Sequence, residues 1–145
     1  MNSIKTIYAR IDVPLDMEDT FALVTNWEFQ QKWVLATKVW GVGETSNKLG
    51  GKIEAFTGLK KLGFLDTMTI TKWDPPNLCE VTHTGSVVKG SGIFEVSNLD
   101  NKTFLTWTET TIIPFGFIGK FGWIIVSPFI KLGMIISLRR FRKLL

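Results

Sequence analysis

The chain has little of the chemistry on which most catalytic and metal sites depend. Its 145 residues include one cysteine and one histidine. The lone Cys79 excludes an intramolecular disulfide and fits a reducing compartment. The lone His83 excludes a metal centre built from several histidines, so no metal is expected. The sequence also lacks a GxSxG nucleophile elbow and the GK[ST] ending of a phosphate-binding loop, and no cofactor is expected.

Acidic residues are absent from the last quarter of the chain. Residues 111–145 hold six Lys or Arg and no Asp or Glu, whereas residues 1–110 carry a net charge of −2. A nucleic-acid binder is not expected, because the basic cluster is short and confined to the end. The N-terminus lacks the continuous apolar stretch of a signal peptide. We therefore expect a cytoplasmic protein whose basic, apolar tail is the candidate for peripheral membrane contact.

Hydrophobic periodicity divides the chain into strands and helices. Residues 3–13 alternate as a strand does, and Asp16 and Asn26 are suited to cap two short helices. A long apolar helix is expected over residues 118–143, a length of about 39 Å. Between them, turn-forming residues separate six segments with strand character, near 37–44, 51–58, 62–73, 78–86, 90–98 and 102–112.

This order of elements predicts a single α+β domain over residues 1–145. Successive strands with short connections pair as antiparallel hairpins, and the helices then cover one face of the sheet. A strongly curved sheet that holds one long helix leaves a space between the two layers. Such spaces are preferred sites for apolar ligands.

Several segments in this order carry a resemblance to a known superfamily. They are IDVPLDMEDTFALVTN, Trp33, Trp73-Asp74-Pro75-Pro76, GSGIFEVSNLDNKTFLTWTE and the terminal helix. Their order and spacing resemble the START-related superfamily, also called SRPBCC, and within it the polyketide cyclase/dehydrase and lipid-transport branch. The resemblance implies a helix-grip fold, in which a seven-stranded antiparallel sheet wraps around the C-terminal helix beside a deep hydrophobic cavity. Relatives bind lipids, sterols, hormones, quinones or polyketides, and some of them are enzymes.

Alternation within the strands predicts which side chains line this cavity. Asp66, His83 and Glu109 share strand faces with apolar residues, so we expect polar groups with shifted pKa values in an apolar pocket. The other interpretation places these three side chains at strand ends, in contact with water or with their neighbours. The residues expected to bind a ligand are Met68, Ile70, Val81, His83, Phe94, Val96, Leu105, Trp107, Glu109, Phe121, Ile125 and Phe129.

Two further features are candidate sites. Cys79 and His83 share a strand face but lie about 13 Å apart at the usual rise, so Cys79 is expected in the core rather than in a Cys–His dyad. The glycine-rich segment GVGETSNKLGG is expected to join two strands, with Thr45 to Leu49 as a hypothetical lid over the cavity mouth. Trp33 is expected in the core, and Trp27 fits either the core or a ligand contact.

The terminal helix has more apolar surface than one sheet can cover. The stripe expected to fill the concave face of the sheet consists of Ile118, Phe121, Ile125, Phe129, Leu132 and Ile136. Three partners remain open for the other sides: the rest of the domain, a second copy in a homodimer, or a bilayer that attracts Arg139, Arg140, Arg142 and Lys143. Basic residues also suit a helix C-terminus through its dipole. A spanning helix is not expected, because Lys131 near its middle costs about 2.5–3.5 kcal/mol and Pro128 interrupts its interior.

These observations favour a protein that binds or carries a hydrophobic small molecule, lipid-like or polyketide-like, in an internal cavity. Apolar side chains would supply the affinity, and Glu109 or His83 would orient the ligand. The first alternative is an enzyme of the polyketide cyclase/dehydrase kind, with Glu109, His83 or Asp66 as its catalytic acid or base. The second is a protein-interaction module that docks through its basic tail.

Overall fold

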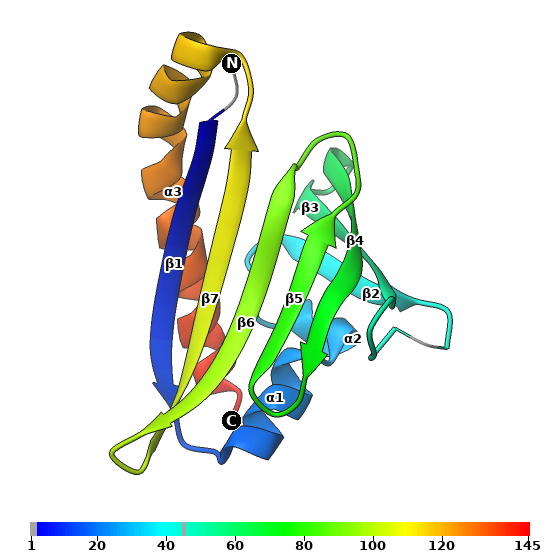
Figure 1. Cartoon of the computed structure of the whole chain (residues 1–145), viewed down its shortest axis with the longest axis vertical. Coiled ribbons are helices and arrows are strands. Elements are labelled where there is room, and N and C mark those ends of the chain that lie inside the picture. The colour runs from blue at the N-terminus through cyan, green and yellow to red at the C-terminus, as the bar shows by residue number, and fades with distance from the viewer. Residues whose placement is uncertain (1–2, 45) are drawn as a thin grey trace.

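A computed structural model describes residues 3–44 and 46–145, which form seven strands and three helices (Figure 1). The chain begins with β1 (Ser3–Val13), α1 (Met17–Val24) and α2 (Trp27–Gln30). Six strands follow: β2 (Thr37–Val42), β3 (Lys52–Leu59), β4 (Leu62–Asp74), β5 (Leu78–His83), β6 (Gly90–Leu99) and β7 (Lys102–Ile113). The last element is α3 (Gly116–Lys143), a helix of 28 residues.

The seven strands form one antiparallel sheet in the order β1-β7-β6-β5-β4-β3-β2. Every neighbouring pair except β1 and β7 is consecutive in the sequence, so hairpins build most of the sheet. Figure 1 shows α1 and α2 behind the sheet, and α3 passing from beside β1 to behind β7 and β6. The helices therefore cover one face of an open sheet, which is the expected helix-grip arrangement.

Local signals in the sequence place the elements closely. Asp16 and Asn26 each accept a hydrogen bond from the backbone N–H three residues further on, at 2.8 and 3.1 Å, so both expected N-caps are confirmed. The strand boundaries agree within one residue, except that β2 ends at Val42 and β5 at His83, where the sequence predicts strands to 44 and 86. Gly43 ends β2 because its φ of +78° is left-handed and turns the chain.

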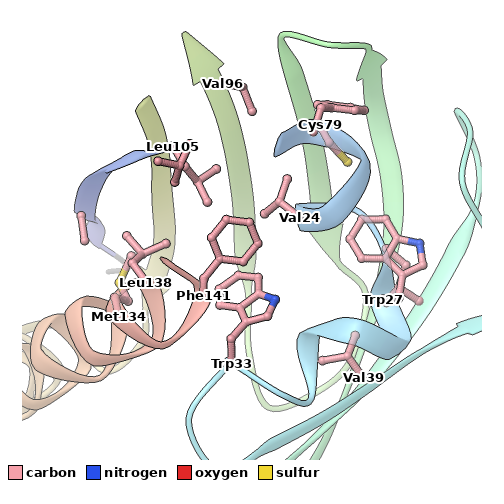
Figure 2. Packing of buried hydrophobic residues seen from close by; sticks show 14 of the residues in the cluster. Val24, Trp27, Trp33, Val39, Cys79, Val96, Leu105, Met134, Leu138 and Phe141 are labelled. Atoms are coloured by element: carbon pink, nitrogen blue, oxygen red, sulfur yellow. The ribbon is translucent and has the colours of Figure 1, made fainter. Parts of the chain in front are cut away.

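The core lies between the sheet, the two short helices and the end of α3 (Figure 2). Trp27 and Trp33 are 2% and 0% exposed, so both belong to the core. Trp33 packs edge-on against Phe141 of α3, with ring centroids 5.1 Å apart. Cys79 is buried in the same cluster, and this burial, together with the charge of Glu80, raises the pKa of its thiol to about 12. Cys79 is therefore the unreactive core residue that its position predicts.

The two halves of α3 differ in burial. The second half, residues 131–143, buries Met134, Ser137, Leu138 and Phe141. The first half, residues 116–130, is partly or fully exposed at every position, and Phe117 is 84% exposed. By length and composition α3 could cross a membrane, and only 17% of an apolar 18-residue window within it is buried in the protein.

The orientation predicted for α3 is wrong. Five of the six residues expected to fill the concave face lie on the outward side, where Ile118, Phe121, Ile125, Phe129 and Leu132 are between 52% and 78% exposed. The sixth, Ile136, is partly buried. The first half has Lys120 as its one charged residue and is otherwise apolar on nearly all sides, so its periodicity does not select a face. The second half is amphipathic, and its Arg139 and Lys143 continue the same stripe at spacings of three and four residues. Because these two charges face water, the helix turns the apolar stripe outward with them.

Candidate ligand-binding cavity

A cavity of about 440 Å³ lies between the sheet and α3. Strands β2 to β7 provide most of its lining, and Trp123, Ile130 and Met134 line it from α3. The lining is mainly apolar and aromatic, and both this character and the volume are typical of small-molecule sites. Three ionisable residues, Asp66, His83 and Glu109, belong to the lining.

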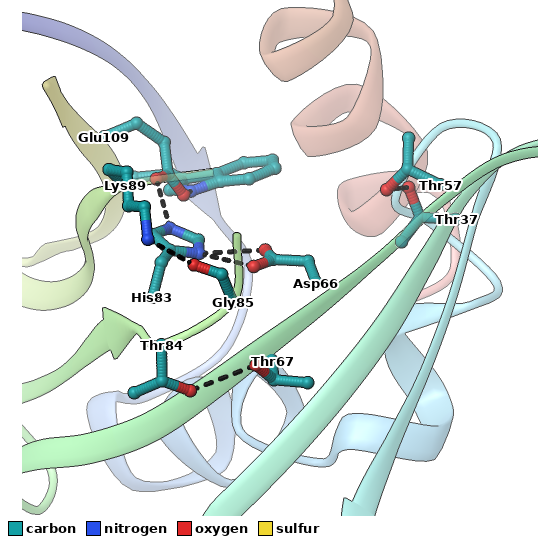
Figure 3. A network of polar contacts seen from close by, with 10 residues as sticks. Thr37, Thr57, Asp66, Thr67, His83, Thr84, Gly85, Lys89 and Glu109 are labelled. Atoms are coloured by element: carbon teal, nitrogen blue, oxygen red, sulfur yellow. Dashed lines mark hydrogen bonds and ion pairs between the residues drawn. The ribbon is translucent and has the colours of Figure 1, made fainter. Parts of the chain in front are cut away.

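These three residues contact one another and form the charged cluster, which consists of Asp66, His83 and Glu109 (Figure 3). His83 Nδ1 lies 2.8 Å from Asp66 Oδ2, and His83 Nε2 lies 3.2 Å from Glu109 Oε2. The indole N–H of Trp107 donates to Glu109 Oε1 at 2.8 Å. The side chains of His83 and Asp66 are 6% and 11% exposed, whereas that of Glu109 is 23% exposed. Glu109 is therefore the member that a ligand can most readily reach.

Glycine at position 92 allows the charged cluster to form. His83 is on β5 and Glu109 is on β7, so the two side chains must meet across β6. Gly92 of β6 is the residue that pairs with Glu109. A Cβ atom at Gly92 would lie 2.8 Å from Glu109 Oε1, so a larger residue there would displace the carboxylate. A glycine inside a strand commonly marks such a close approach.

The two carboxylates set the charge of His83. Burial by itself lowers the pKa of His83, but the hydrogen bonds and charges of Asp66 and Glu109 outweigh burial and raise this pKa from 6.5 to about 9. His83 is therefore an imidazolium at neutral pH, and each of its N–H groups faces a carboxylate. One cation between two carboxylates gives the charged cluster a formal charge of −1. Its remaining hydrogen-bonding capacity is that of an acceptor, because only carboxylate lone pairs are left.

The same geometry does not favour a metal ion. His83 lies between the two carboxylates and donates to both, so the three side chains do not converge on an open point. Across residues 3–44 and 46–145, no group of three or more His, Cys, Asp or Glu side chains could hold a metal ion.

The twelve residues predicted to bind a ligand fall into three groups. Met68, Val81, His83, Phe94, Trp107 and Glu109 line the cavity. Ile70, Val96 and Leu105 point from the same sheet face into the core, where each is at most 2% exposed. Phe121, Ile125 and Phe129 lie on the outward side of α3 and are 61%, 54% and 71% exposed. Strand alternation thus selected the correct face of the sheet, whereas the apolar helix gave no such guide.

Sequence reasoning missed Gly92 and the α3 residues that do line the cavity. Trp123, Ile130 and Met134 follow one another at helical spacings on the inward side of α3. The sequence signal for these three residues was the position of the basic residues in the second half of α3, which mark the outward side of the helix and so identify the inward side. The signal for Gly92 was its place inside a predicted strand.

The segment predicted as a lid is described in part, because Thr45 lies outside the described residues. The carbonyl of Ser46 accepts a hydrogen bond from the indole N–H of Trp27 at 3.0 Å, and the Asn47 amide donates to the Thr25 carbonyl at 2.7 Å. These bonds hold Ser46 and Asn47 against the junction of α1 and α2. The lid hypothesis remains a prediction.

Comparisons with known proteins support the fold alone. No family model and no curated protein matches the chain. Protein TTHA0849 from Thermus thermophilus has a similar structure, with a TM-score of 0.76 and 12% identity over 96% of this chain and 95% of that one. A Rhodobacter sphaeroides protein gives a TM-score of 0.73 and 13% identity over 99% and 97% of the two chains. SA2116 from Staphylococcus aureus, described as a protein of unknown function, gives 0.73 and 10% over 96% and 91%. Such low identities indicate a shared architecture and leave function to the site.

Proposed function

We propose that this protein binds or carries an apolar small molecule in the cavity between the sheet and α3, as a cytoplasmic member of the START-related superfamily. The observation that supports this proposal is the charged cluster of Asp66, His83 and Glu109 in the wall of a mainly apolar cavity of about 440 Å³. Apolar walls supply affinity at about 25 cal/mol per Å² of apolar area removed from water. A few convergent polar groups then fix the orientation of the ligand.

The charged cluster also specifies the polar end of the ligand. Both N–H groups of His83 are already donated, so the free capacity lies on carboxylate oxygens, most accessibly those of Glu109. A ligand must therefore donate a hydrogen bond, as a hydroxyl, an amide N–H or an ammonium group does. A carboxylate would meet a formal charge of −1 and two imidazole N–H groups already in use. We expect alcohols and amines to bind more tightly than acids of the same chain length.

An enzyme of the cyclase/dehydrase kind is the second candidate, and the same charged cluster favours it. A general base must be unprotonated at the working pH. His83 is poorly suited to that role, because its pKa is raised to about 9. Glu109, which is 23% exposed at the cavity wall, is the better candidate. A Glu109→Gln variant that still binds but no longer converts a polyketide-like substrate would favour the enzyme over the carrier.

Displacement of a neutral dye tests the carrier proposal directly. Nile red is bound to the purified protein and then displaced with decanol, decylamine or decanoate. We expect the alcohol and the amine to act at concentrations at least about tenfold below those of the acid, because a second negative charge is repelled in a partly buried site. Native mass spectrometry of the freshly purified protein identifies any molecule that it already carries.

Matched variants separate the two parts of the proposal. Glu109→Gln should weaken the preference against decanoate, whereas Glu95→Gln, on an exposed position of β6, should leave it unchanged. Equal displacement by all three probes would contradict the assignment of the polar end. A protein that binds neither the dye nor any of the probes would contradict the cavity proposal itself.

A further inference from the structure

We propose that the outward face of α3 docks the protein on the surface of an anionic lipid bilayer. This outward face consists of Ile118, Phe121, Ile125, Phe129, Leu132, Arg139 and Lys143. Its five apolar residues are between 52% and 78% exposed. A contiguous apolar stripe of this kind is unusual on a monomeric protein and marks an interaction surface.

The charges beside the stripe favour a bilayer over other partners. The outward face ends in Arg139 and Lys143, and residues 111–145 hold six basic residues and no acid. An open groove of about 1010 Å³ between β1 and the second half of α3 is lined by five basic residues and one acid, Asp12. An apolar helix face with basic residues beside it is suited to the interface of a membrane that contains anionic lipids. A second copy of the chain would bring two such basic surfaces together, and like charges repel.

The second half of α3 fixes the helix along the protein and so favours a helix that lies in the membrane surface. Phe141 packs against Trp33, and the ammonium of Lys131 donates to the backbone carbonyl of Tyr8. The same ammonium lies 4.5 Å from the centroid of the Tyr8 ring. A membrane-spanning helix would have to break these contacts, whereas interfacial docking keeps them.

Docking also brings the cavity close to the bilayer. Trp123 and Ile130 line the cavity from the inward side of the first half of α3, while Phe121 and Phe129 expose the opposite side. One helix therefore separates the cavity from the proposed membrane surface. The passage of an apolar ligand between bilayer and cavity is an inference that rests on the proposed function. Docking of the protein on the bilayer does not depend on it.

Co-sedimentation of the whole chain with vesicles tests the proposal. We expect binding to vesicles of phosphatidylcholine mixed with phosphatidylglycerol, much weaker binding to phosphatidylcholine alone, and release at high salt. Phe121→Ser/Phe129→Ser should reduce binding more than about tenfold, because two inserted side chains are lost. Its control is Leu59→Ser/Leu62→Ser, which removes two side chains that are 74% and 83% exposed in the β3–β4 hairpin, outside α3.

A second pair of variants tests the charges. Arg139→Glu/Lys143→Glu should weaken binding to the anionic vesicles at least about 25-fold, since each of the two basic residues near the surface contributes about a factor of five. Lys48→Glu/Lys102→Glu changes the net charge equally at exposed positions outside α3 and should have little effect. No binding to anionic vesicles, or equal losses in variant and control, would overturn the proposal. So would a protein that is dimeric without lipid and becomes monomeric in Phe121→Ser/Phe129→Ser, or one that resists extraction by high salt.

Discussion

The first and second halves of α3 are both rich in apolar residues, yet the fold places them in opposite environments. The second half presents Leu138 and Phe141 to the core and turns Arg139 and Lys143 to water. The first half presents Trp123 to the cavity and leaves Phe121 and Phe129 exposed. Amphipathicity in one half of a rigid helix thus decides what the other half exposes.

The layer beneath α3 changes along the length of the helix. Under the second half lie Val96, Leu105 and Trp33, at most 2% exposed, which form a solid core. The cavity, with His83 and Glu109 in its wall, lies under the middle of α3, where Trp123, Ile130 and Met134 line it. Each of the central strands β5 to β7 contributes to both regions, because the inward-facing residues of one strand run from the core into the cavity. The domain therefore separates stability and binding along the length of its strands.

The largest difference in the free energy of unfolding is expected between two variants, each of which removes one phenylalanine ring from one half of α3. Phe141→Ala should lower the free energy of unfolding by about 3–5 kcal/mol, because a fully buried phenylalanine leaves a cavity against Trp33. Phe129→Ala should change it by less than about 0.5 kcal/mol, because that ring is 71% exposed. Urea denaturation of the two variants measures both values. Similar losses in the two variants would show that the first half also packs against the protein.

An effect of intermediate size on the free energy of unfolding should come from the protonation of His83 in the charged cluster. The pKa of His83 is about 9 in the folded protein and about 6.5 when unfolded, so the folded state binds more protons between these values. The free energy of unfolding is then highest below pH 6.5 and falls as the pH rises towards 9, by at most about 3 kcal/mol. His83 is the only histidine, which makes the assignment direct.

Urea denaturation at a series of pH values checks this effect. Measurements between pH 6.5 and about 7.5 stay below the ordinary pKa of cysteine, which is about 8.5, so Cys79 contributes little to the slope there. His83→Gln should flatten the profile over this range, whereas Phe129→Ala should keep its slope. A profile that already lacks the slope in the native protein would contradict the contacts of His83 with Asp66 and Glu109.

The strands were predictable because two independent signals agreed. Alternation placed Val81, His83, Phe94 and Trp107 on one face, and turn residues marked where each strand ends. The inward face of the sheet follows from these signals without any knowledge of the partners.

The contacts within the site were not predictable from the sequence. His83 meets Glu109 across an intervening strand, which depends on the register of three strands and on Gly92. A shift of register by one residue would turn a whole strand to its other face, and a single sequence does not fix that register. The rotation of α3 depended on a few charges at one end of the helix, which outweighed the longer apolar pattern. Long-range geometry of this kind is set by tertiary packing rather than by local periodicity.

The smallest difference in the free energy of unfolding is expected between two serine variants, one in each half of α3. Ser137 is 1% exposed, donates to the Gly133 carbonyl at 2.7 Å and accepts from the backbone N–H of Leu35 at 2.9 Å. Ser137→Ala removes the acceptor of that N–H and should lower the free energy of unfolding by about 1–2 kcal/mol. Ser127 is partly exposed in the first half of α3, so Ser127→Ala should change the free energy of unfolding by less than about 0.5 kcal/mol. Hydrogen exchange at the Leu35 amide should rise in Ser137→Ala alone, and equal exchange in the two variants would show that α3 does not hold this loop through Ser137.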